Sequence, residues 1–221
     1  EAVKKEYASA FGISEERIYV LGLPRTDLLL NTSFLEEKRE EFLRVYERLR
    51  GKKCILYAPT FRDDEVEHPR IHLDLDRMSK ELGEDEVLMI RLHPFVADRA
   101  GMVLDEGKWD NIINVSGYAG VTTLLAAADV LITDYSSIVF EYCLRGKPMI
   151  FYAYDLERFE SEGRSFYRNY ENFVSGPVAR TEDELIECLK KRDMTRVGRF
   201  VEQNFTYLDG KSTSRLLELI F

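Results

Sequence analysis

Short apolar runs alternate with amphipathic stretches along most of the 221 residues, and this alternation limits the fold more than any other feature. Apolar runs rich in β-branched and aromatic residues are typical of strands buried on both faces, and the stretches between them carry apolar residues at helical spacing. We therefore predict an α/β fold with a parallel sheet and helices on both of its faces. The predicted strands are residues 17–21, 53–58, 86–92, 112–115, 130–133 and 149–152.

Capping residues and apolar periodicity mark the helices between these strands. Residues 155–175 are charged and aromatic without a clear period, so we expect a short helix followed by a long ordered loop there. No repeat, low-complexity tract or linker interrupts the pattern, and we predict a single domain over residues 1–221. The predicted helices are 33–49 with the capping box Ser33-x-x-Glu36, 73–82, 120–128, 136–145 ending at Gly146, and one opened by the capping box Thr181-x-x-Glu184.

Composition excludes several classes of protein. The net charge of −9 argues against nucleic-acid binding, which needs a basic surface. Asp129 interrupts the longest apolar run, residues 124–132, so we expect a soluble domain with no membrane span. Cys54, Cys143 and Cys188 lie far apart within apolar stretches, which predicts buried, unpaired thiols in a cytoplasmic protein. The chain begins at Glu1 without the features of a secretory signal, and we expect it to be cut from a longer protein.

The residues that follow the strands are the candidates for a site, because parallel α/β sheets bind ligands at the carboxyl ends of their strands. Basic and hydroxyl groups gather there although the whole chain is acidic. The candidates are Arg25 after the first predicted strand, Arg62 after the second, His93 with Pro94 after the third, and Thr133 at the end of the fifth with Asp134, Ser136 and Ser137 after it.

Ser136 and Ser137 stand where a helix is predicted to begin. The first turn of a helix has unpaired N–H groups and the positive end of the helix dipole, which suit a phosphate. Either serine could instead simply cap the helix. Glu141, one turn further along, is placed to accept hydrogen bonds from a polyol or sugar hydroxyl, or else is a solvated carboxylate.

His93 and Arg62 also have two interpretations each. His93 emerges from a buried strand and is followed by Pro94, so it is either a site residue or a structural histidine. Arg62 could hold a pyrophosphate by two hydrogen bonds or pair at the surface with Asp63 or Asp64. These aspartates have no metal-binding partner at ligand spacing, so we predict no metal site.

Five segments extend this pattern over nearly the whole chain. They are Gly-Leu-Pro-Arg-Thr-Asp at 22–27, Tyr-Ala-Pro-Thr-Phe-Arg at 57–62, Arg-Leu-His-Pro at 91–94, Ala-Asp-Val-Leu-Ile-Thr-Asp-Tyr-Ser-Ser at 128–137, and Gly-Lys-Pro-Met-Ile-Phe-Tyr at 146–152. In this order and spacing they resemble the CDP-glycerol glycerophosphotransferase family of teichoic-acid polymerases and primases. The resemblance implies a GT-B-like enzyme that uses no metal or other cofactor, of which residues 1–221 are the carboxy-terminal, Rossmann-like, CDP-glycerol-binding half.

The resemblance also implies roles for the strand-end residues. His93 would lie against the donor phosphates as the catalytic group, and the helix start at Ser136 and Ser137 would receive the pyrophosphate. Arg62 would neutralise part of the phosphate charge, and Arg25, Pro94, Thr133, Asp134 and Glu141 would complete the donor site. The family often has Asp where Glu141 stands, and often Arg-Gly before Phe-Tyr where this chain has Arg164-Ser165-Phe166-Tyr167.

The implied partners are CDP-glycerol and a polyol-phosphate or lipid-linked acceptor, with no nucleic acid. The resemblance also implies a His-Gly motif in the amino-terminal acceptor half, whose histidine acts on the acceptor hydroxyl. This chain contains no His-Gly pair. The parent protein would then be cytoplasmic and peripheral at the inner face of the cell membrane, through other segments. Alternatives are a donor-binding module without turnover of its own, a CDP-ribitol transferase, or half of a nucleotide-sugar glycosyltransferase or epimerase.

Overall fold

A computed structural model describes residues 3–97, 104, 107–161 and 166–221. Within these residues, six parallel strands form one sheet in the order β3-β2-β1-β4-β5-β6, which confirms the predicted α/β class. This order is that of the dinucleotide-binding Rossmann sheet. The strands are β1 (Lys53–Tyr57), β2 (Glu86–Ile90), β3 (Ile112–Asn114), β4 (Val130–Thr133), β5 (Met149–Tyr152) and β6 (Val178–Ala179).

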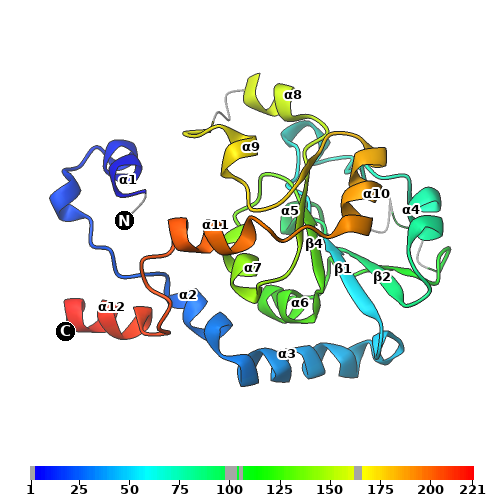
Figure 1. The fold of residues 1–221 in the computed structure, drawn as a ribbon, viewed down its shortest axis with the longest axis horizontal. Helices are drawn as coiled ribbons and strands as arrows, with labels where there is room; N and C mark the ends of the chain where they lie inside the picture. Colours follow the sequence, from blue (N-terminus) through cyan, green and yellow to red (C-terminus); the bar gives the residue numbers. More distant parts are fainter. Residues whose placement is uncertain (1–2, 98–103, 105–106, 162–165) are drawn as a thin grey trace.

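Helices cover both faces of the sheet, as predicted (Figure 1). Side chains alternate along each strand, so Leu56 of β1 belongs to one apolar layer while Ile55 and Tyr57 belong to the other. The first layer is supplied by α3 (Thr32–Val45), α6 (Val121–Ala127), α7 (Val139–Tyr142) and α11 (Val197–Asn204). The second layer is supplied by α4 (Leu75–Glu81), α5 (Pro94–Ala97) and α10 (Glu182–Lys191).

The strand predicted over residues 17–21 does not form. Arg17 closes the short 3₁₀ turn η1 (Glu15–Arg17), and the residues after it pair with no strand among the described residues. Tyr19 is 64% exposed, so the apolar run that suggested a strand is not buried against the sheet. The sixth strand is instead β6, whose two residues are too few to give a recognisable period.

Two helix starts differ from prediction. The side chain of Asn31 caps α3 by accepting a hydrogen bond from Phe34 N at 3.1 Å, so Ser33 lies inside the helix and its capping box is wrong. The helix predicted from residue 136 begins at Val139 and continues as the 3₁₀ turn η6 (Cys143–Arg145). The capping box of Thr181 is confirmed, and so is the helix end at Gly146, whose φ is 60°.

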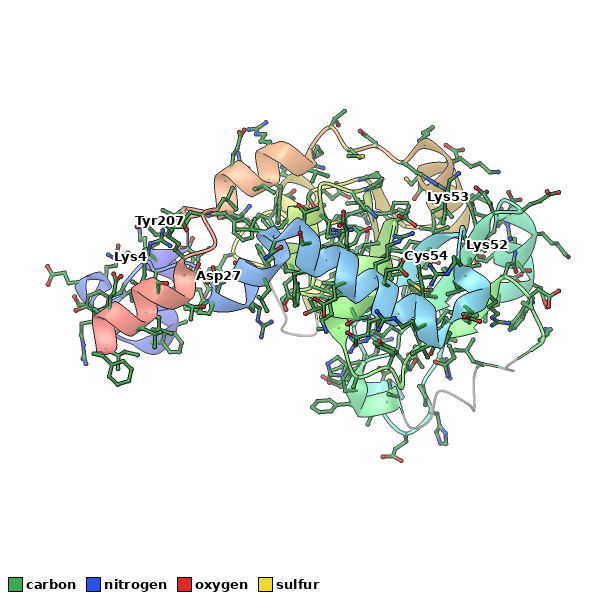
Figure 2. The ribbon with its side chains drawn as sticks, turned by 90° about the horizontal axis from the view of Figure 1, so that it is seen from below. Lys4, Asp27, Lys52, Lys53, Cys54 and Tyr207 are labelled. Atoms are coloured by element: carbon green, nitrogen blue, oxygen red, sulfur yellow. The ribbon has the colours of Figure 1, made fainter. Side chains whose placement is uncertain are left out.

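A second group of helices lies away from the sheet, where α1 (Lys4–Phe11) and α12 (Ser212–Ile220) stand to one side in Figure 1. Asp27, at the end of α2 (Pro24–Asp27), caps α12 by accepting hydrogen bonds from Ser212 N at 3.0 Å and Thr213 N at 2.8 Å. Figure 2 shows Asp27 beside α12, at the far end of the molecule from Lys53. Asp27 of the motif at 22–27 is therefore an anchor for α12.

The remaining short elements connect these layers. No helix among the described residues is long and apolar enough to cross a membrane. The prediction for the thiols is confirmed for Cys54 and Cys143, which are buried and unpaired, whereas Cys188 is unpaired but only half-buried. The connecting elements are η2 (Leu28–Leu30), η3 (Glu47–Leu49), η4 (Asp63–Glu65), α8 (Leu156–Ser161) and α9 (Tyr170–Phe173).

Candidate functional site

β1 and β4 are neighbours at the centre of the sheet, and the side on which the chain adds its next strand reverses between them. β1 leads to β2 on one side, and β4 leads to β5 on the other, so the loops after β1 and β4 diverge. Ligands of open parallel sheets bind in the crevice at such a switch point. Because all the strands are parallel, Arg62, His93 and Ser136 follow strands at the same edge, as predicted.

Two side chains at the end of β4 hold the switch-point loops together. Thr133 Oγ1 donates a hydrogen bond to Ala58 O at 2.7 Å, and Asp134 Oδ1 accepts one from Thr60 N at 2.8 Å. Asp134 is only 2% exposed and Thr133 is fully buried. Both residues therefore shape the crevice from within the fold, and the expectation that their side chains face a ligand does not match this placement.

Arg62 lies at the centre of a buried ion cluster. Its guanidinium makes a two-point contact with Asp155, from Nε to Oδ2 at 2.7 Å and from one terminal nitrogen to Oδ1 at 2.9 Å. The same terminal nitrogen is 3.0 Å from Oδ2 of Asp134, and the other donates to Thr60 O at 2.6 Å. Arg62 is 6% exposed, so neither sequence interpretation holds: the guanidinium is not free for a pyrophosphate, and it does not pair with Asp63 or Asp64 at the surface.

Aromatic rings and buried charges complete the Arg62 cluster. The guanidinium lies 5.2 Å from the ring centre of Tyr135 and 5.4 Å from that of Tyr154, within the range of cation–π attraction. Burial raises the pKa of Asp134 by more than Arg62 lowers it. Burial would also raise the pKa of Asp155, but the hydrogen bonds and charge of Arg62 outweigh it, so that pKa falls below its ordinary value. The cluster thus ties together the loops after β1, β4 and β5.

His93 stands between the end of β2 and α5. Its ring contacts Phe61 with centres 4.6 Å apart and Phe95 with centres 4.9 Å apart. Its Nδ1 accepts a hydrogen bond from Phe95 N at 3.3 Å, so in the neutral ring the proton is on Nε2. Burial, followed by the charge of Arg91, lowers the pKa of His93. Pro94 is exposed at the first position of α5, which suits a proline.

A cleft beside His93 contains residues that the sequence interpretation passed over. His72 lies in this cleft, where its Nε2 is 2.8 Å from Glu65 Oε1 and its ring stacks on Tyr154 at 4.4 Å. Tyr154 and Asp155 stand two and three residues after the end of β5, so a search of the residues after each strand could have identified them as it identified His93. The cleft is lined by Tyr57, Pro59, Thr60, Phe61, Arg62, Glu65, Pro69, Arg70, His72, Leu92, His93, Val96 and Tyr154.

The two serines precede the helix rather than lying in its first turn. Ser136 is half-buried, and its Oγ accepts a hydrogen bond from Ile138 N at 3.3 Å, which is a local turn of the kind serine favours. Ser137 is exposed. Because α7 begins at Val139 and spans only four residues, the helix dipole available at this place is small.

Arg25 and Glu141 meet each other. Arg25 reaches Oε1 of Glu141 with a nitrogen at 2.8 Å, although 116 residues separate them in the chain. The side chain of Arg25 is 70% exposed, whereas that of Glu141 is 12% exposed. Arg25 thus comes to the region of α7 from α2, and the strand expected to deliver it is absent.

Two further points of the sequence analysis concern a metal site and the residues at 164 and 165. Among the described residues, no group of three or more His, Cys, Asp or Glu is placed to hold a metal ion. Arg164 and Ser165, where the sequence departs from the family's Arg-Gly, lie outside the described residues.

The strand order and the switch-point crevice define a Rossmann-like α/β protein. Comparison with known proteins gives the family. A sequence profile described as CDP-glycerol:poly(glycerophosphate) glycerophosphotransferase matches residues 1–221, and the chain belongs to this family.

Relatives in the family are named as polymerases and primases of teichoic acid. The chain is 36% identical to the teichoic acid poly(ribitol-phosphate) polymerase of Bacillus spizizenii, over 100% of the chain and 36% of that protein. It is 34% identical to the teichoic acid poly(glycerol phosphate) polymerase of Staphylococcus epidermidis, over 97% of the chain and 31% of that protein. The chain therefore spans about a third of the length of these two relatives and is related to transferases of teichoic acid synthesis.

Solved structures agree with this assignment. The wall teichoic acid polymerase TagF, whose fold is GT-B-like, superimposes with a TM-score of 0.82 at 33% identity, covering 100% of this chain and 55% of TagF. One TagF variant was solved after a soak with CDPG. A putative UDP-N-acetylglucosamine 2-epimerase from Listeria monocytogenes, with a TM-score of 0.60 at 19% identity over 98% of this chain and 56% of its own, shares the fold.

Proposed function

We propose that residues 1–221 form the donor-binding half of a transferase that moves glycerol phosphate from CDP-glycerol to a teichoic-acid-type acceptor and releases CMP. One observation carries the proposal: the switch-point crevice is bordered by the strand-end motifs that contain His93, Ser136 and Ser137. The family profile over the whole chain and the TagF structure soaked with CDPG support CDP-glycerol as the donor.

In the proposed reaction, an acceptor hydroxyl attacks the glycerol-bearing phosphorus in line, and CMP leaves. Phosphoryl transfer depends mainly on positioning and on stabilising charge. His93 is suited to this role as a neutral ring, because its lowered pKa keeps it uncharged near pH 7 and its Nε2 proton is available to a phosphate oxygen. It therefore acts as a hydrogen-bond donor to the departing CMP phosphate.

The other strand-end residues contribute to donor binding in different ways. The exposed Ser137 and the backbone of its turn offer donors to the pyrophosphate, with Ser136 holding the turn. Glu141, held by Arg25, accepts hydrogen bonds from a hydroxyl of the donor. Arg62 contributes indirectly, because it fixes the loops through Asp134 and Asp155.

The acceptor half lies outside this chain in the proposal. No His-Gly pair occurs in the sequence, so the base that activates the acceptor hydroxyl would come from an amino-terminal domain. The parent protein would work at the inner face of the cell membrane, where a lipid-linked or polyol-phosphate acceptor is held by other segments.

A second candidate donor is CDP-ribitol. The ribitol-phosphate polymerases reach 36% identity with the chain, whereas the glycerol-phosphate enzymes range from 31% to 34%. A thermal-shift panel with CDP-glycerol, CDP-ribitol, UDP-sugars and CMP separates these donors, because a ligand that binds the folded state raises its stability. Stabilisation by UDP-sugars alone would contradict a CDP-polyol donor of either kind.

Turnover tests the role of His93. In the enzyme that contains both halves, His93→Ala should lower CMP release by about a hundredfold to a thousandfold while CDP-glycerol binding weakens only modestly, as expected for a donor aimed at charge in the transition state. His93→Gln, which keeps an N–H near the position of Nε2, should recover part of the loss. His68→Ala, in a polar loop after β1, is the matched control. Unchanged turnover in His93→Ala would reduce His93 to a structural residue.

A further inference from the structure

Arg91 differs from the other arginine at this edge of the sheet. Arg62 is surrounded by carboxylates, whereas no carboxylate of the described residues pairs with Arg91. Arg91 is half-buried, and its Nε is buried without a hydrogen-bond partner among those residues. No contact among the described residues compensates the hydration that this buried Nε has lost. An anion bound from outside the chain would supply the missing partner.

The position of Arg91 follows from the register of the sheet. Its backbone N donates to Tyr57 O at 2.9 Å, which continues the β1–β2 ladder and sets Arg91 beside Ala58. Ala58 N in turn donates to Ile132 O, so Thr133 is the next neighbour. Because side chains alternate, Arg91 points to the same layer as Val87 and Met89.

This row lies at the switch point itself. Arg91, Ala58 and Thr133 come from β2, β1 and β4, and the middle side chain is a single methyl group. Thr60 and His93, each two residues further along the chain than Ala58 and Arg91, line the cleft at this edge of the sheet. The loop after β1 supplies a second polar atom without a partner, Thr60 Oγ1, which is also buried.

Asp134 Oδ2 also lacks a hydrogen bond but lies 3.0 Å from the cation of Arg62, so the groups left without either kind of partner here can act as hydrogen-bond donors. Arg91 offers N–H groups, Thr60 a hydroxyl, and His93, two residues after Arg91, the N–H of Nε2. Burial and, after it, the charge of Arg91 lower the pKa of His93. A convergence of donors around one unpaired guanidinium suits a group with several acceptor oxygens and negative charge.

We propose that Arg91 binds a phosphate group in the switch-point crevice. Its guanidinium takes the role that the sequence predicted for Arg62. The planar guanidinium matches two phosphate oxygens, and Thr60 is placed to add a third hydrogen bond. Under the proposed function this phosphate belongs to the nucleotide diphosphate of the donor. The same chemistry would bind a phosphate of the acceptor polymer, and the ligands below separate the two sources.

Calorimetric binding to two variants and a control tests the proposal. Arg91→Met removes the charge while filling a similar volume, and Arg91→Lys keeps the charge without the planar fork. Arg145→Met is the matched control, because Arg145 is also half-buried with an unpartnered Nε but bonds to Ala126 O, away from the crevice. The ligands are inorganic pyrophosphate, CMP, CDP-glycerol, CDP-ribitol and a glycerol phosphate oligomer, with cytidine as the ligand without phosphate.

Arg91→Met should weaken binding of pyrophosphate and CMP by about tenfold to a hundredfold, the usual range for a lost charge-assisted hydrogen bond. Cytidine binding should not change, Arg91→Lys should fall between, and Arg145→Met should match the wild type. Without ligand, Arg91→Met should melt no lower than the wild type, because it removes an uncompensated charge. A structural ion pair would give the opposite result, a clear loss of melting temperature.

The remaining outcomes are distinct. Weaker binding of the CDP-polyols assigns Arg91 to the donor, whereas weaker binding of a glycerol phosphate oligomer alone assigns it to the acceptor. If the wild type binds pyrophosphate through Arg91 but neither CDP-polyol, the phosphate site stands and the proposed donor falls. Equal affinity of wild type and Arg91→Met for every phosphate ligand, or an equal loss for cytidine, overturns the proposal.

Discussion

Replacing Arg62 by methionine would leave Asp134 and Asp155 at buried strand ends without their cation. The change removes the two-point contact with Asp155, the 3.0 Å ion pair with Asp134 and the hydrogen bond to Thr60 O. Breaking a buried ion pair from one side costs about 3–5 kcal/mol, because a charge stays buried and unpaired. Against a usual total of about 5–15 kcal/mol, we expect Arg62→Met to lose a large part of its free energy of unfolding.

Two further variants locate the cause. Arg62→Lys keeps the charge but replaces the fork by a single ammonium, so it should lose less, about 1–3 kcal/mol. Asp155→Asn removes one carboxylate, and combining it with Arg62→Met should cost less than the sum of the single changes, because the pair acts together. Urea denaturation followed by circular dichroism measures each free energy of unfolding.

The pH dependence of the free energy of unfolding tests the same ion pairs. In the wild type the pKa of Asp155 is below its ordinary value, so its stabilisation is present above the unfolded pKa and is lost as the pH falls through the folded pKa. Without Arg62, the pKa of both carboxyls should rise, and protonation should relieve the unpaired charges as the pH falls. The deficit of Arg62→Met should therefore shrink between pH 7 and pH 5. A deficit below about 1 kcal/mol, or one independent of pH, would refute this reasoning.

Three more predictions rest on single contacts. Asp27→Ala should cost about 1–2 kcal/mol in urea denaturation, the usual cost of losing a helix cap, and an unchanged free energy of unfolding would contradict the capping role. In an NMR titration His93 should have a pKa below the ordinary value of about 6.5, so it should lower stability as the pH falls through that value; a midpoint above it would be inconsistent with the burial described. Burial raises the pKa of Cys54 to about 11 and of Cys143 to about 12, so native thiol titration at pH 7 should modify neither, whereas the half-buried Cys188 should react first. Rapid reaction of Cys54 would show that its part of the core opens.

The sheet was predictable because its strands are buried on both faces. Val87 to Ile90 are all apolar for this reason, and the same is true of β4 and β5. The edge strand β6 was missed, since two residues carry no period. Residues 17–21 resemble a strand in composition, but their packing depends on distant segments that local pattern does not reveal.

The site was predictable in position but not in the roles of its side chains. Parallel topology brings the strand ends to one edge, so His93 and Ser136 were correctly placed there. Which arginine lacks a carboxylate partner depends on ion pairs between residues far apart in the chain. Asp155 stands 93 positions after Arg62 and captures it, while Arg91 is left without a carboxylate, and no sequence spacing encodes this difference.

The cap that Asp27 provides for α12 also sets an order of events during synthesis. Its partner Ser212 lies 185 positions later in the chain, so at the usual ~5–20 residues per second Asp27 waits about 9 to 37 seconds on the ribosome for it. Gly22 lacks a side chain and so leaves room for Ser212 Oγ, and it too can meet Ser212 only after that residue is synthesised. All six strands of the Rossmann sheet have been synthesised by residue 179, before α12 begins. Docking of α12 on Asp27 thus follows the synthesis of every strand, and we expect a nascent chain stalled before residue 212 to leave the surface around Asp27 open to proteases.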